Sequence, residues 1–142
     1  MKLKAFLSAL FLLPVIIVTS CKDAYKFEEV VMPAPVVRVE KFPDKAVKVD
    51  STVTITVLYE PTNGCGRYSD TVWTSSPLLE TYQILVAYPK DQDVVCADKS
   101  NLIRYSIQYK FTRAGTQRFR FWQEDGKYLD AEVLVNPKEQ TL

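Results

Sequence analysis

The stretch QRFRFWQEDGKYLDAEV, residues 117–133, contains two runs in which apolar and polar side chains alternate, separated by a short polar turn. Such alternation is typical of β-strands that have one buried and one exposed face. The two apolar faces lie on the same side only if the connecting loop has an odd number of residues. The segment EDG supplies three, with Gly126 at the left-handed position of a bulged turn. The stretch therefore predicts a β-hairpin of residues 117–123 and 127–135.

The odd loop also fixes the register of this hairpin. It pairs Phe121 with Leu129 and Phe119 with Ala131 on the inner face, and Trp122 with Tyr128, Arg120 with Asp130 and Arg118 with Glu132 on the outer face. The outer pair Trp122 and Tyr128 is either a cross-strand aromatic contact or a rigid platform for a sugar ring or a partner side chain. Trp73, in DTVWTSS, is a second partner-binding candidate, with core or edge packing as its alternative.

The same period of two runs through most of the chain after Pro35. We expect five further strands, in STVTITVLYE (51–60), TYQILVAY (81–88) and IRYSIQYKF (103–111) and near residues 36–41 and 68–74. Sustained helical periodicity is absent from the sequence. Seven short strands separated by turn signals indicate an all-β fold, a two-layer antiparallel β-sandwich of about seven strands.

The N-terminal segment MKLKAFLSALFLLPVIIVTS joins a basic start, with Lys2 and Lys4, to an apolar run from Ala5 to Val18. A basic start followed by an apolar run of this length is typical of a secretory signal peptide. A membrane-spanning helix needs about 20 apolar residues, and Pro14 interrupts this run. A permanent transmembrane segment is therefore disfavoured.

The apolar run ends in VTSC, residues 18–21, which resembles the lipobox of bacterial lipoproteins. The resemblance implies that residues 1–20 are a signal peptide and that Cys21 carries fatty-acyl chains, such as palmitate, that anchor the protein in a membrane. The alternative is an ordinary secretory signal with an incidental cysteine. We then expect residues 21–34 to form a tether and residues 35–142 to form the sandwich domain.

Removal of residues 1–20 leaves 122 residues, the size of one domain, with 16 basic and 17 acidic side chains and a net charge of about −1. This balance gives no electrostatic footprint for nucleic acid. An exported protein meets an oxidising compartment, so we expect Cys65 and Cys96 to form a disulfide, with free thiols as the alternative. The chain has no histidine, so Cys65 has no Cys-His partner and a zinc site would need an unusual ligand set.

The composition also argues against enzyme activity. Without histidine, the Ser-His-Asp and Cys-His arrangements and histidine-ligated metals are excluded. The four glycines, at 64, 66, 115 and 126, form no phosphate-binding loop. Asp91, Asp93 and Asp98 lie close together in sequence but lack EF-hand spacing, so we expect a solvated loop, with a calcium site as the alternative. We expect no catalytic residue, no cofactor and no metal.

The segment YKFTRAGTQRFRF, residues 109–121, resembles the strand-turn-strand of bacterial immunoglobulin-like domains. Together with the lipobox, NGC around Cys65 and VVCADKS around Cys96, it makes the chain similar to small lipoproteins common in Bacteroidota, a group to which no activity is assigned. The resemblance implies an immunoglobulin-like β-sandwich and membrane tethering. It does not extend to the antibody-type core, because both cysteines fall in expected loops.

Two non-catalytic classes of function remain. We favour a membrane-anchored binding or structural module that holds an envelope protein or a glycan at the bacterial cell envelope. The alternative is a small inhibitor of an envelope-attacking hydrolase, such as lysozyme or a protease. We expect an outer membrane lipoprotein, and Lys22-Asp23 after the lipidated cysteine leaves open whether it faces the periplasm or the cell surface.

Overall fold

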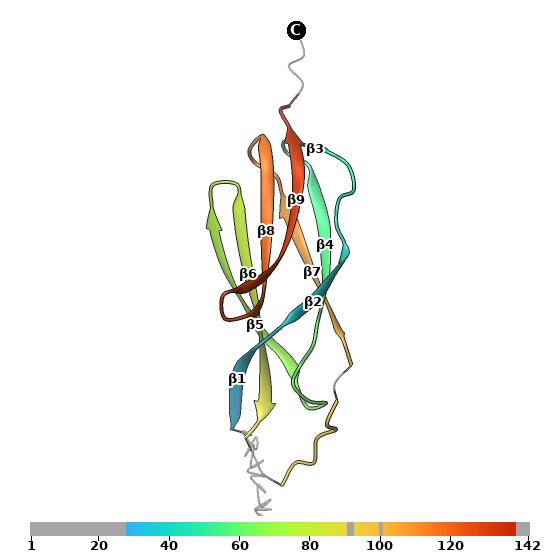
Figure 1. Ribbon diagram of the computed structural model, residues 1–142, viewed down its shortest axis with the longest axis vertical. Helices are drawn as coiled ribbons and strands as arrows, with labels where there is room; N and C mark the ends of the chain where they lie inside the picture. Colours follow the sequence, from blue (N-terminus) through green and yellow to red (C-terminus); the bar gives the residue numbers. More distant parts are fainter. Residues whose placement is uncertain (1–27, 91–92, 100, 139–142) are drawn as a thin grey trace, which may run out of the picture.

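The computed structural model describes residues 28–90, 93–99 and 101–138, which form β-strands and turns (Figure 1). Its nine strands are β1 (Glu29–Ala34), β2 (Val36–Lys41), β3 (Val47–Lys48), β4 (Thr52–Tyr59), β5 (Arg67–Ser76), β6 (Leu79–Pro89), β7 (Ile103–Lys110), β8 (Gly115–Glu124) and β9 (Lys127–Asn136). This part of the chain has no helix long and apolar enough to cross a membrane. The predicted signal peptide and Cys21 lie outside the described residues.

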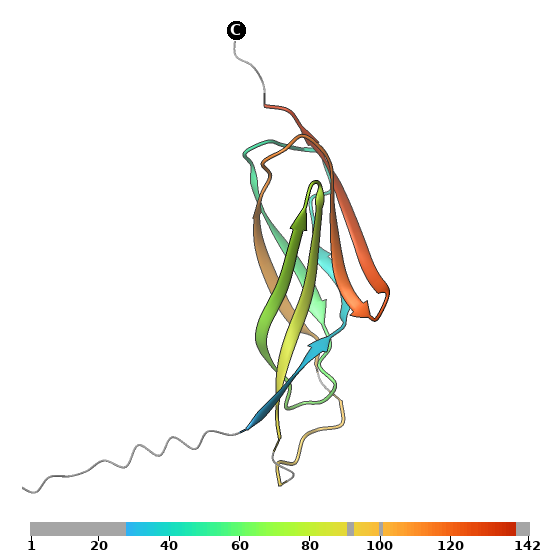
Figure 2. The ribbon, with the colours of Figure 1, turned by 90° about the vertical axis from the view of Figure 1, so that its left-hand side faces the viewer.

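The strands form two sheets that pack against each other (Figures 1 and 2). The larger sheet has six strands, in the order β1-β6-β8-β9-β3 with β5 paired to β6, and the smaller has the order β2-β4-β7. The predicted all-β sandwich is confirmed. The described residues contain nine strands instead of about seven, because β1 and β3 were not predicted.

Most strand pairs are antiparallel, as expected, but two are parallel. β6 runs parallel to β8 along Leu79 to Tyr82, and the two-residue strand β3 runs parallel to β9. This mixed pairing differs from the two antiparallel sheets of an immunoglobulin domain. The immunoglobulin-like strand order therefore stays a prediction.

β1 corrects the predicted boundary between tether and domain. It lies within the expected tether of residues 21–34, yet it pairs with β6 from Glu29 opposite Pro89 to Ala34 opposite Ile84. All its side chains except that of Ala34 are exposed, so the strand lacks the alternation of a half-buried strand. Backbone pairing with β6 places β1 in the sheet, and the hydropathy pattern cannot predict such pairing. The ordered fold thus includes residues before Pro35.

The core between the sheets consists of the inward side chains of the alternating strands. Its fully buried large residues are Tyr59, Phe111, Phe119, Phe121, Ile55, Ile84, Val36, Val57, Val86 and Val135. Burial of this apolar surface is the main force that holds the layers together. The apolar positions of the alternating runs in β6 and β8 and most of those in β4 are core residues, although Val53 is half-buried. Those of β7 are only half-buried, because β7 borders the smaller sheet.

The β8–β9 hairpin has the predicted register at all five pairs, including Trp122 opposite Tyr128. A register shift next to the turn corresponds to the expected bulge. Gly126 has a φ of 77°, the left-handed conformation that glycine adopts at low cost.

Candidate functional site

The predicted aromatic pair on the outer face of the hairpin, Trp122 and Tyr128, packs beside charged side chains. Trp122 is half-buried, and Tyr128 is 39% exposed. The Arg120 guanidinium lies 5.4 Å from the centroid of the Tyr128 ring, and its Nε donates a hydrogen bond of 3.0 Å to Asp130 Oδ1. Arg118 lies 3.7 Å from Glu132, so both arginines face the predicted acidic partners. One face of the Tyr128 ring is thus already covered by a neutralised cation.

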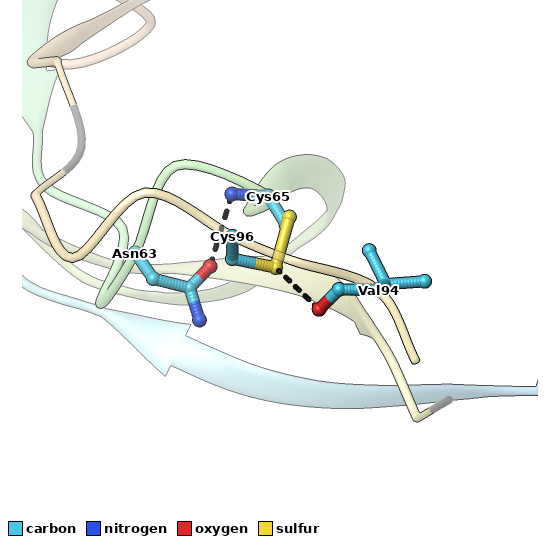
Figure 3. Close-up of a disulfide and its surroundings, with 4 residues drawn as sticks. All are labelled: Asn63, Cys65, Val94 and Cys96. Atoms are coloured by element: carbon cyan, nitrogen blue, oxygen red, sulfur yellow. Dashed lines mark hydrogen bonds between the residues drawn. A yellow bond between two sulfur atoms is a disulfide. The ribbon is translucent and has the colours of Figure 1, made fainter. Parts of the chain in front are cut away.

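Cys65 and Cys96 form the predicted disulfide, which joins the β4–β5 and β6–β7 loops (Figure 3). Their Cα atoms are 5.4 Å apart, within the usual range for a bridge. The loops also meet through Gly64, whose N–H donates to Ala97 O at 2.9 Å, while the Cys65 N–H donates to Asn63 Oδ1 at 3.0 Å. The two sulfurs bond each other and therefore act as a structural cross-link.

The acidic loop gives no support for a metal site in the part that is described. Asp91 lies outside the described residues, and Asp93 and Asp98 lie on an exposed loop. Among the described residues no three His, Cys, Asp or Glu side chains are close enough together to hold a metal ion.

Trp73 lies on β5, which forms one border of the larger sheet (Figure 1). Figure 2 faces this side of the molecule and shows β5 with β7 on one side and β6 on the other, followed by the β8–β9 hairpin. The smaller sheet has only three strands and does not cover β5, whose residues are exposed except for the half-buried Thr71. The core-facing side of β5 is therefore open to solvent.

A β-bulge sets which side chains of β5 point to this open side. Trp73 pairs with Tyr82 and Thr71 with Ile84, and both partners face the core. Tyr68 precedes Trp73 by five positions, so a regular strand would direct it to the opposite face. The register shift between Tyr68 and Asp70 places Tyr68 opposite the core residue Val86, on the same side as Trp73.

We call the resulting depression between β5 and β7 the aromatic groove. It has a volume of about 430 Å³ and is lined by Tyr68, Asp70, Thr71, Trp73, Tyr82, Tyr105, Ile107, Gln108, Tyr109 and Lys110. This volume falls in the range of about 300–1,000 Å³ that is typical of small-molecule sites. Four tyrosines and one tryptophan thus line one open groove.

Two contacts cross the aromatic groove from one sheet to the other. The rings of Tyr68 on β5 and Tyr105 on β7 stack with centroids 5.3 Å apart and an interplanar angle of 19°. The hydroxyl of Tyr109 on β7 donates a hydrogen bond of 2.8 Å to Glu80 Oε1 on β6. These contacts hold the two walls of the groove in fixed positions.

Glu80 fixes the orientation of the most exposed ring in the groove. Its side chain is only 4% exposed, and its carboxylate accepts hydrogen bonds from Trp73 Nε1 at 2.7 Å, Ser75 Oγ at 3.0 Å and the Tyr109 hydroxyl. Trp73 is 59% exposed, and its ring lies nearly parallel to that of Tyr82, at an angle of 8° with centroids 6.4 Å apart. A buried carboxylate thus anchors a solvent-exposed indole.

Burial and the carboxylate of Glu80 favour the neutral form of two phenols in the groove, those of Tyr82 and Tyr109. Burial, followed by the hydrogen bond to Glu80 and its charge, raises the pKa of Tyr109. Burial and then the charge of Glu80 raise the pKa of Tyr82. Both hydroxyls therefore remain protonated at neutral pH, and Tyr109 remains a hydrogen-bond donor to the carboxylate.

A second depression, which we call the polar pocket, adjoins the groove. It has a volume of about 260 Å³ and is lined by Ser75, Ser76, Pro77, Leu78, Glu80, Tyr109, Thr112, Arg113 and Gln117. Tyr109 lines both depressions, and Glu80 lines the pocket while its carboxylate binds Trp73 of the groove. The side chain of Gln117 is buried. The aromatic groove is thus followed by a pocket lined with hydroxyl, amide and charged groups.

The polar pocket lies far from the disulfide along the long axis of the molecule. Its residues come from the β5–β6 turn, the β7–β8 connection and the adjoining strand ends, at the end of the fold where β9 leaves towards the C-terminus (Figures 1 and 2). β1 begins at the opposite end, where the Lys90 N–H donates to Glu28 O at 2.8 Å. The chain therefore enters the fold at the end that carries the disulfide.

The sequence identified Trp73 but not the residues that surround it. Tyr105 and Tyr109 occupy apolar positions of the predicted alternating strand 103–111. They face inward, but the open side of β7 leaves them half-buried. Glu80 could have been identified from the sequence. It occupies an inward position two residues before Tyr82, where a charged residue is rare unless it has partners. No known family model, curated protein or solved structure matches this chain, so the site rests on its own geometry.

Proposed function

We propose that this chain is a membrane-anchored lipoprotein that acts as a non-catalytic binding module at the bacterial cell envelope, with the aromatic groove as its ligand site. The observation that carries the proposal is that Trp73 is 59% exposed and yet held by the buried carboxylate of Glu80. Aromatic side chains dominate the energetics of interfaces. A ring that is already fixed loses little conformational entropy when a ligand binds, which favours affinity.

The chemistry of the groove supports binding in preference to catalysis. The buried carboxylate of Glu80 already accepts hydrogen bonds from three side chains and serves to hold them in place. The pKa values of buried Tyr82 and half-buried Tyr109 are raised, so both phenols stay neutral. Exposed Trp73 and half-buried Tyr105 and Tyr109 offer surface for contact.

The path of the chain agrees with an anchor at Cys21. From Cys21 to Glu28 the chain reaches at most about 25 Å when fully extended. Glu28 lies at the disulfide end of the fold, and the polar pocket lies at the other end. A lipid on Cys21 would thus hold the disulfide end towards the membrane and leave the ligand site accessible.

Retention on immobilised envelope fragments tests the proposed function. The full-length protein in detergent micelles is passed over fragments of the bacterial envelope. We expect the wild type and the Trp122→Ala control to be retained and Trp73→Ala to pass through. Absence of wild-type retention, or equal retention of Trp73→Ala, would contradict the proposal.

Inhibition of an envelope-attacking hydrolase is the second candidate, and Val95 favours it. This side chain is 96% exposed and precedes Cys96, which the disulfide holds in place. An exposed residue on a cross-linked loop suits insertion into an active site. The candidate requires stoichiometric inhibition of lysozyme or a protease that is lost in Val95→Asp but kept in Trp73→Ala.

A further inference from the structure

We infer that the ligand of the aromatic groove is a neutral oligosaccharide, with one pyranose ring stacked on Trp73 and a neighbouring sugar in the polar pocket. This inference rests on the proposed function of the groove and adds the chemical class of the ligand. The ring surfaces, the polar groups and the charges of the two depressions support it.

The ring surfaces match the faces of a sugar. The face of an aromatic ring carries partial negative charge. A pyranose presents C–H groups, which carry partial positive charge, on its faces and hydroxyl groups around its rim. Trp73 is exposed and its orientation is fixed by the Glu80 carboxylate, so it offers a flat surface before any ligand binds. Tyr105 and Tyr109 on β7 form the facing wall.

The polar groups match the rim of a sugar. Ser75, Ser76 and Thr112 line the polar pocket with hydroxyl groups. Ser75 and Ser76 donate their protons to Glu80 and to Leu79 O, so their oxygens can accept hydrogen bonds from sugar hydroxyls, whereas a threonine hydroxyl can both donate and accept. Gln117 adds an amide, which also has donors and an acceptor, and Arg113 adds donors only. Since Tyr109 borders both depressions, a chain of linked sugars can occupy both at once.

The charges of the site favour a neutral ligand. The two depressions together contain two acidic side chains, Asp70 and Glu80, and two basic ones, Lys110 and Arg113. Lys110 also lies 3.7 Å from Asp50, so part of its charge is compensated. A polyanion such as a phosphorylated glycan, or a strongly basic peptide, would find no excess of opposite charge here.

Binding of neutral hexasaccharides tests the inference. Full-length protein in detergent micelles is titrated calorimetrically with cellohexaose, maltohexaose and xylohexaose. We expect at least one to bind, with an affinity that falls about 30-fold in Trp73→Ala. Trp122→Ala should bind as the wild type does, because Trp122 lies on the outer face of another hairpin.

Chemical treatment of the immobilised envelope fragments separates the inference from the proposed function. Periodate cleaves vicinal diols of sugars, and a protease removes proteins. We expect periodate to abolish retention of the wild type and protease to leave it unchanged. Retention that survives periodate and is lost after protease, together with no hexasaccharide binding, would overturn the carbohydrate inference and leave the proposed function standing. Absence of retention on untreated fragments would overturn both.

Discussion

At the scale of single residues, the site depends on the three hydrogen bonds that Glu80 accepts. An ionised carboxylate only accepts hydrogen bonds, whereas an amide has two donors on its nitrogen. Trp73, Ser75 and Tyr109 all present donors to this carboxylate. Glu80 is therefore a positioning residue: it does not need to contact the ligand to decide whether the indole is ready to receive it.

Glu80→Gln should release Trp73 while it keeps the volume of the side chain. We expect the free energy of unfolding to fall by about 2 kcal/mol, because buried hydrogen bonds to a charged group are lost. Ligand affinity should fall about tenfold, because the indole must then be ordered on binding. Glu132→Gln is the matched control: it makes the same change at an exposed carboxylate on β9, outside both depressions, and should leave the affinity close to that of the wild type. Chemical denaturation and calorimetry measure the two effects, and an unchanged affinity in Glu80→Gln would refute the positioning role.

Two tyrosines near the disulfide end give opposite predictions for the same substitution. The hydroxyl of Tyr59 is buried with no hydrogen-bond partner among the described residues, and burial raises the pKa of this group. The Tyr88 hydroxyl accepts a hydrogen bond of 2.8 Å from the Thr62 N–H. Tyr59→Phe should therefore raise the free energy of unfolding by about 1 kcal/mol, and Tyr88→Phe should lower it by about as much. Equal losses in the two variants, measured by urea denaturation, would contradict this assignment.

At the scale of elements, the alternation of apolar and polar residues predicted the strands and the register of one hairpin. The register of the β8–β9 hairpin followed from the odd loop between two alternating runs, and all five predicted pairs are present. β1 escaped prediction because its exposed residues do not alternate. The groove escaped because alternation shows which side chains face inward but not whether the opposite sheet extends far enough to cover them, and β5 and β7 both lie at sheet borders.

The disulfide links the two loops at one end of the sandwich. It closes a segment with a sequence separation of 31, for which the loop-entropy model gives about 3 to 4.7 kcal/mol. The double variant Cys65→Ala, Cys96→Ala should lose stability of this order in denaturant unfolding. It should keep most of the ligand affinity, because the Glu80 carboxylate that holds Trp73 lines the polar pocket, which lies towards the other end. An unchanged midpoint of unfolding would contradict a stabilising role for the bridge.

At the scale of the whole molecule, the account joins a proposed anchor at one end to a proposed ligand site towards the other. Cys21→Ser should abolish incorporation of a fatty-acid analogue and release the protein from the membrane fraction. The fold should remain intact, because the strands begin at Glu29, well after the substituted residue. Metabolic labelling and fractionation measure both effects, and a wild-type protein that takes up no label would end the lipoprotein proposal.

The central claim is that Trp73 forms a rigid, exposed surface that receives the ligand. The chain has two tryptophans, so its heteronuclear NMR spectrum contains two indole N–H signals, which Trp122→Phe assigns. The account predicts an order parameter for the Trp73 indole near that of rigid backbone, about 0.85. It also predicts that a bound hexasaccharide moves the Trp73 signal and leaves that of Trp122 in place. A Trp73 order parameter below about 0.6, or a ligand that moves only the Trp122 signal, would contradict it.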